Sequence, residues 1–193
     1  MRIKPLAKRL LLLSGLPGVG KTTVVQKVVE ELKTEGFAVG GMLSREVRSG
    51  ASRVGFEIQD IGSQERGWLA HVDQRDGPRV GRYRVNLRDL NRVGAEAILR
   101  AASVADAVVV DEVGPMETLS PEFRRAVETA VESDKLFIGV VHWKAHHSLI
   151  RRLKERQDAE TFVVTQENRG SFPHVIAEKA VAFILAHRRS AGP

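Results

Sequence analysis

The chain of 193 residues contains no cysteine. Without cysteine there is no disulfide framework, no thiolate-bound zinc and no thiol nucleophile, so three classes of protein are excluded at once. Aromatic residues are also few, with two tryptophans and one tyrosine. Trp68, Tyr83 and Trp143 are too isolated along the chain to form a platform on which nucleic-acid bases stack.

No apolar stretch reaches the roughly 18 residues that a membrane-spanning helix needs. A basic start is followed by four leucines at residues 10–13, which is too short a run for a signal peptide. We therefore expect a cytoplasmic protein without a membrane partner and with a basic tail over residues 1–8. The length fits a single domain over residues 1–193, and a monomer is compatible with it.

Positive charge is the unusual bulk feature, with a formal net charge of +6 at pH 7. Residues 1–100 hold 18 basic and 11 acidic residues, whereas the remainder of the chain is nearly balanced. Such an excess invites a nucleic-acid-binding hypothesis, which predicts binding with a steep salt dependence. Because the arginines are scattered and no run of five basic residues occurs, a solvated surface explains the charge better, and we do not expect nucleic acid as a partner.

Two kinds of strand pattern indicate an α/β fold. Unbroken apolar runs, typical of strands buried on both faces of a parallel sheet, occur at residues 10–13, 107–110, 136–141 and 162–164. Between them, apolar residues recur at helical spacing within residues 25–32, 90–101, 123–131 and 176–184. This alternation predicts a mostly parallel sheet flanked by helices, with right-handed crossovers.

Residues 53–61 and 82–85 instead alternate between apolar and polar side chains, which is typical of half-solvated antiparallel strands. They predict an antiparallel strand insertion over about residues 37–86 that contains two exposed strands. Helix ends are marked as well: Gly36 is expected to end the first helix, and Ser120 before Pro121 to begin a later one.

A phosphate-binding loop follows the first predicted strand. Its residues match the pattern G-x-x-x-x-G-K-[ST] and stand before a helix, as the chemistry requires. Backbone N–H groups of such a loop cradle phosphate, Lys21 reaches the β- and γ-oxygens, and the hydroxyl of Thr22 is a ligand for Mg²⁺. The predicted nucleotide-binding residues of the loop are Gly15, Leu16, Pro17, Gly18, Val19, Gly20, Lys21, Thr22 and Thr23.

Two carboxylates end the predicted strand at residues 107–110. Asp111 is expected to lie at the carboxyl edge of the sheet beside the phosphate loop, where it would hold Mg²⁺ together with Thr22. Alternation along a strand sends Glu112 to the other side, so it has a different task. We predict Glu112 as the general base that activates water, with Lys21 as the second catalytic residue.

Several motifs together resemble those of the THEP-type nucleoside-triphosphatases, a P-loop family that includes the cancer-related nucleoside-triphosphatases. They lie at residues 15–23, 44–48, 55–56, 80–83, 111–117 and 165–169. The resemblance covers roughly residues 9–185. It implies a single RecA-like domain that hydrolyses ATP, GTP and other nucleoside triphosphates, including CTP and UTP, slowly and with Mg²⁺.

Further candidates surround this site. Asn168 is a candidate contact to base or ribose, and Arg169 a candidate partner for the transferred phosphoryl group. His142 ends a predicted strand and could sense the γ-phosphate; a metal site with His146 and His147 is a weaker alternative. Other arginines that could reach the mouth of the site are Arg48, Arg53, Arg151, Arg152 and Arg156.

The same loop and carboxylates suit a second hypothesis, a nucleotide or small-molecule kinase whose acceptor is unidentified. A kinase must exclude water before it closes on its acceptor, usually with a mobile lid. The arginine-rich residues 66–92 are the only stretch long enough for a lid, but the strand pattern around Tyr83 favours an ordered segment. Hydrolysis without an acceptor is therefore the favoured prediction.

Overall fold

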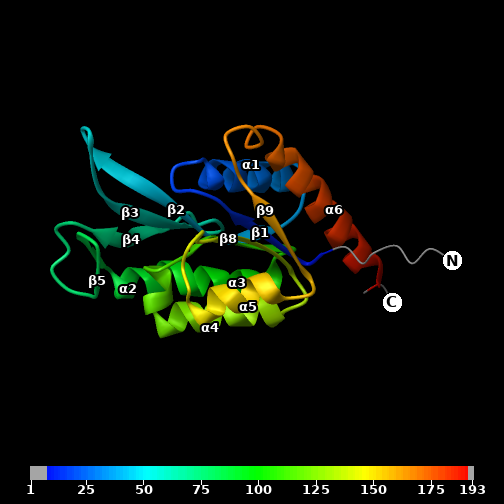
Figure 1. Ribbon diagram of the computed structural model, residues 1–193. Helices are drawn as coiled ribbons and strands as arrows, with labels where there is room; N and C mark the ends of the chain where they lie inside the picture. The colour runs from blue at the N-terminus through cyan, green and yellow to red at the C-terminus, as the bar shows by residue number, and fades with distance from the viewer. Residues whose placement is uncertain (1–7, 191–193) are drawn as a thin grey trace.

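A computed structural model describes residues 8–190, so the predicted basic tail, apart from Lys8, lies outside the described residues. The strands join in one nine-stranded sheet in the order β5-β6-β4-β3-β2-β7-β8-β1-β9, with helices on both faces (Figure 1). Among residues 8–190, no helix is long and apolar enough to cross a membrane.

The parallel half of the sheet confirms three of the four predicted buried strands, whereas the fourth, predicted at residues 162–164, is the edge strand β9, in which only Phe162 is buried. Neighbouring strands run parallel throughout this half, and β1, β7 and β8 are almost wholly buried. Its members are β2 (Val39–Ser49), β7 (Ala107–Val113), β8 (Leu136–Val141), β1 (Leu10–Ser14) and β9 (Ala159–Val163). The carboxyl ends of β1, β7 and β8 therefore meet at one edge, where the loops after them can share a ligand.

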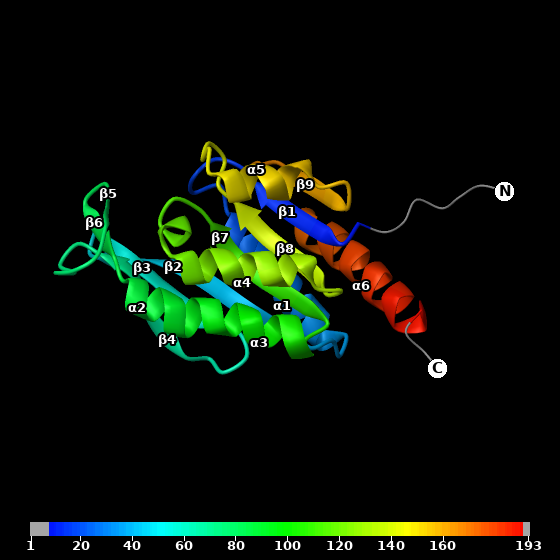
Figure 2. The ribbon, with the colours of Figure 1, turned by 90° about the horizontal axis from the view of Figure 1, so that it is seen from below.

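Helices cover the two faces unequally (Figure 2). One face packs against α1 (Lys21–Thr34) and α6 (Phe172–Ser190), and the other against α3 (Glu96–Val104), α4 (Pro121–Glu132) and α5 (Ser148–Glu155). Two short segments, α2 (Leu87–Asp89) and a π-helical turn over Leu90–Ala95, lead into α3.

Both predicted helix ends are confirmed. The Ser120 hydroxyl accepts a hydrogen bond from the backbone N–H of Phe123 at 3.0 Å, which satisfies a free N–H at the start of α4. Gly36 follows α1 with a φ of 83°, a left-handed conformation that costs glycine little.

The antiparallel insertion lies within the predicted bounds but has more strands than predicted. Instead of two exposed strands it holds the outer half of β2 together with β3 (Ser52–Asp60), β4 (Arg66–His71), β5 (Arg79–Val80) and β6 (Tyr83–Val85). We call residues 43–85 the wing; Figure 1 shows it projecting from the sheet beside α2. β2 belongs to both halves, because residues 39–42 pair in parallel with β7 and residues 42–49 pair antiparallel with β3.

Candidate functional site

The phosphate loop connects β1 to α1 and depends on glycine at its first position. Gly15 has a φ of 150°, and a side chain there would come within 2.6 Å of the backbone oxygen of Val164. Gly18 and Gly20 also have positive φ values, 74° and 106°. The loop therefore turns tightly enough to bring its N–H groups and the first turn of α1 around one point, as phosphate binding requires.

Lys21 and Thr22 extend from the first turn of α1 into the loop and toward β7. The Nζ of Lys21 donates hydrogen bonds to the backbone oxygens of Gly15 at 3.1 Å and Leu16 at 3.2 Å, so its charge lies across the mouth of the loop. The Thr22 hydroxyl and the backbone N–H of Ser44 both lie close enough to Asp111 to lower the pKa of its carboxyl group. Three elements, α1, β7 and β2, thus meet at Asp111.

Asp111 is 1% exposed, and its Oδ2 atom has no hydrogen-bond partner among the described residues. Burial raises the pKa of Asp111 to about 7, because a charge away from water is unfavourable, although the hydrogen bond from Thr22 acts in the opposite direction. An orphaned carboxylate oxygen beside a hydroxyl group fits Mg²⁺, which is bound through few protein oxygens and completes its shell with water and phosphate. In residues 8–190, no group of three His, Asp or Glu side chains could hold a metal by itself.

A cavity of about 570 Å³ opens between the phosphate loop and the wing. Its polar wall includes Lys21, Thr22, Glu112 and His142, and its wing side includes Phe56. Glu112 is half-buried and faces this space, whereas the neighbouring Asp111 is withdrawn behind Thr22. The two adjacent carboxylates therefore have different surroundings, as different tasks demand. A wider hollow of about 760 Å³ lies between α1 and α6 but contains no part of the phosphate loop.

Glu117 is a further carboxyl group in the cavity that the sequence reasoning did not select. It begins a short helical turn, Glu117–Leu119, after β7 and is only 5% exposed. Burial and the nearby Glu112 raise its pKa to about 8. Three acidic residues within the seven residues 111–117 were the only available signal, and the pattern of a strand end did not indicate which of them would be buried.

Two predicted contacts lie in the loop after β9. Arg169 extends over the phosphate loop, with its Cδ atom 3.5 Å from the place that a side chain at Gly20 would occupy. Asn168 lies in the same loop, but its amide group holds that loop together. Its Oδ1 atom accepts from the N–H of Thr165 at 2.8 Å, and its Nδ2 atom donates to the backbone oxygen of Val163 at 2.9 Å.

Comparisons with known proteins agree with this geometry. A model of the NTPase family matches residues 10–177. The chain belongs to the NTPase family. Nucleoside-triphosphatase THEP1 of Thermofilum pendens is 44% identical over 180 residues, which cover 93% of this chain and 99% of that protein. THEP1 of Methanothermobacter thermautotrophicus is 45% identical over 159 residues, covering 82% and 88%.

Solved structures of NTPase family members share the fold. The crystal structure of THEP1 from Aquifex aeolicus has a TM-score of 0.78 and 27% identity, covering 86% of this chain and 96% of that one. The solution structure of a human cancer-related nucleoside triphosphatase has a TM-score of 0.72 and 30% identity, covering 96% and 100%. The resemblance inferred from the motifs is therefore confirmed.

Of the other residues predicted to belong to the site, Arg53 and His142 line the cavity. The Nε atom of Arg53 lies 2.6 Å from Glu46, which also pairs with Arg48. His142 lies at the end of β8 beside β7, as predicted, and its Nδ1 atom accepts from the N–H of Lys144 at 3.2 Å. In the same way, His147 caps α5 through Nδ1, so these rings do not converge on a metal.

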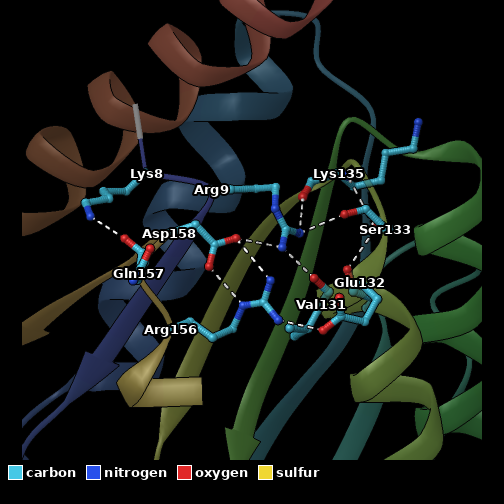
Figure 3. A network of polar contacts seen from close by, with 10 residues as sticks. Lys8, Arg9, Val131, Glu132, Ser133, Lys135, Arg156, Gln157 and Asp158 are labelled. Carbon is cyan, nitrogen blue, oxygen red and sulfur yellow. Dashed lines mark hydrogen bonds and ion pairs between the residues drawn. The ribbon is translucent and has the colours of Figure 1, made fainter. Parts of the chain in front are cut away.

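The expectation that Arg156 reaches the mouth of the site is wrong. It follows α5 and binds Asp158 and Glu132 at the opposite edge of the sheet, where the parallel strands begin (Figure 3). Arg151 and Arg152 are exposed on α5, and Arg152 pairs with Glu128 of α4.

Proposed function

We propose that the protein hydrolyses nucleoside triphosphates, namely ATP, GTP, CTP and UTP, to the diphosphate and phosphate with Mg²⁺. The observation that carries the proposal is the unpartnered, buried Oδ2 atom of Asp111 beside Thr22, at the edge of a cavity that also exposes Lys21 and Glu112. The printed names of the relatives support hydrolysis in general. We place the activity in the cytoplasm as part of the same proposal.

Each residue has one task in this reaction. The loop N–H groups and Lys21 bind the β- and γ-phosphates, and Thr22 and Asp111 are the protein groups that hold Mg²⁺. When bound by these two residues, Mg²⁺ would neutralise part of the negative charge of the triphosphate. Glu112 orients the attacking water and accepts its proton, and Arg169 lies where it can contact the phosphates from above Gly20.

Glu112→Gln and Lys21→Ala test these roles separately. E112Q should lower kcat by about 100-fold or more while the affinity for a non-hydrolysable triphosphate stays within about twofold, because the amide cannot accept the proton. K21A should weaken nucleotide binding as well as turnover. The measurement is phosphate release from each of the four triphosphates with Mg²⁺ and no acceptor. Hydrolysis by E112Q at the wild-type rate would contradict the assignment of the base.

A kinase remains the second candidate because the cavity continues past Glu112 to apolar side chains of the wing, Phe56, Leu69 and Val80. An attacking water molecule needs no apolar surface to bind, whereas an organic acceptor can pack against these side chains. The hydrolysis measurement should therefore be repeated with a panel of nucleosides and nucleotides. Turnover that requires an acceptor would favour the kinase and exclude simple hydrolysis as the function.

A further inference from the structure

Glu117 has no role in the reaction described above, yet it is the most deeply buried of the carboxyl groups that line the cavity. Its Oε2 atom accepts a hydrogen bond from the backbone N–H of Gly114 at 3.1 Å. This bond spans only three residues, within the loop that joins β7 to the turn Glu117–Leu119, so one oxygen is explained by local structure alone. The turn does not explain why the group lies in the wall of the phosphate cavity.

The carboxyl groups of Glu117 and Glu112 both lie close to Gly114. A side-chain carbon at Gly114 would lie 2.9 Å from the Oε2 atom of Glu117 and 3.1 Å from the Oε1 atom of Glu112. Both carboxyl groups therefore border the position of a Gly114 side chain, and a carbon there would displace at least one of them. Since Gly114 does not have a positive φ, the space around it, and not its backbone conformation, favours glycine there.

Two ionised carboxylates so close together would repel each other and the triphosphate. One member of such a pair normally keeps its proton, and the more buried group is the one that does so. Glu117 is 5% exposed and Glu112 is half-buried. Burial, with the charge of Glu112, raises the pKa of Glu117 to about 8, which agrees with an uncharged Glu117 near neutral pH.

Building on the proposed hydrolysis, we propose that Glu117 is an additional catalytic residue, an uncharged carboxylic acid whose O–H group donates a hydrogen bond to an oxygen of the γ-phosphate. The water oxygen attacks the γ-phosphorus, the bond from that phosphorus to the bridging β-oxygen breaks, and Glu112 takes the proton of the water. Glu117 keeps its own proton throughout. Its hydrogen bond strengthens as negative charge shifts over the phosphate oxygens in the transition state.

Glu117→Met and Glu117→Gln test this assignment as a pair. Methionine fills the same space but cannot donate, so E117M should lower kcat by about 100-fold, the usual effect of losing one donor to a developing charge. Glutamine keeps an uncharged donor toward the cavity and an oxygen for the N–H of Gly114, so E117Q should recover most of that loss. In both variants the affinity for a non-hydrolysable triphosphate should remain within about threefold, because the hydrogen bond acts mainly in the transition state.

Thr118→Val is the matched control, because Thr118 belongs to the same buried turn and its hydroxyl donates to the backbone oxygen of Gly114 at 2.8 Å. T118V weakens the turn without removing a group from the cavity, and its kcat should stay within about twofold of wild type. Wild-type kcat in E117M, or an E117Q as impaired as E117M, would overturn the proposal. An equal loss in T118V would also overturn it, because the turn alone would then explain the effect. Failure of the proposed hydrolysis would be visible already in the wild-type protein.

Discussion

The two edges of the parallel sheet hold their charged side chains in opposite ways. Where the strands begin, the Arg9 guanidinium donates to the backbone oxygens of Val131 and Ser133 and to Asp158, with distances of 2.5 to 2.8 Å, and is 14% exposed (Figure 3). Where the strands end, Asp111 is buried with one oxygen that has no partner within residues 8–190, and Glu117 is buried near Glu112. At the first edge the charged groups have hydrogen-bond partners within the protein, whereas at the second edge a buried carboxylate oxygen among the described residues has none.

The difference separates stability from function. At the first edge, Arg9 lies at the carboxyl end of α4, where a positive charge also favours the helix dipole, and it joins α4 to the segment before β9. At the other edge, burial of carboxyl groups destabilises the free protein, and the proposed nucleotide site would account for their presence. Substitutions where the strands begin should therefore lower stability, and substitutions where the strands end should lower turnover.

The largest expected effect is on turnover in Asp111→Asn. It should lower kcat/KM with Mg²⁺ by at least about 100-fold, because the proposed metal site would lose its charged ligand. Its melting temperature without metal should be equal to or higher than that of the wild type, because the amide carries no buried charge. Asp158→Asn is the counterpart at the other edge: turnover should be unchanged and the melting temperature lower. A D111N protein that is as destabilised as D158N would remove the contrast between the edges.

The next largest effect is on the free energy of unfolding. Arg9→Met should lower it by about 1–3 kcal/mol, because it leaves partly buried carbonyls and part of Asp158 without partners. Urea unfolding measures this loss, and kcat should be unaffected. A loss below about 0.5 kcal/mol would mean that the network in Figure 3 contributes no more than a surface ion pair.

Acid should weaken the same edge. Burial raises the pKa of Asp158, but hydrogen bonds from Arg156 and Arg9 outweigh it and hold the pKa below its usual value. Its stabilising contribution is therefore present above the pKa of the unfolded chain, about 4, and is lost as the pH falls through the folded value. The difference in unfolding free energy between the wild type and D158N should accordingly shrink below about pH 4.

The smallest effect is expected on α5, between the two edges. Arg152→Gln removes an exposed ion pair with Glu128, whose side chains are 61% and 44% exposed. It should change the free energy of unfolding by less than about 0.5 kcal/mol and leave phosphate release unchanged. A marked loss of turnover would instead restore Arg152 as a residue of the site.

The sequence predicted the phosphate loop and Asp111 because their chemistry fixes the local backbone: a glycine loop between a buried strand and a helix, and an acid at a strand end. It did not predict that Glu117 would be buried, since that depends on the tight turn at Gly114. Arg156 was misplaced for a topological reason. A crossover helix that leaves one edge of a parallel sheet returns to the other, so residues at the end of α5 lie far from the loop that precedes it.

The number of strands in the wing was also underestimated, for a different reason. The outer half of β2 consists mostly of polar and charged residues, and β4 has only six residues. Neither shows enough apolar alternation to mark a strand, because pairing with neighbouring strands, not burial of one face, holds them in place.

The position of β2 affects how the sequence of this protein can evolve. The strand brings the backbone N–H of Ser44 close to Asp111, where it lowers the pKa of the carboxyl group, and every residue except proline supplies the same N–H. The contribution of β2 to the proposed metal ligand therefore depends on the path of the strand more than on the side chain at residue 44. New wing sequences can be tried on an unaltered phosphate loop, and lineages can acquire different specificities while they inherit one reaction.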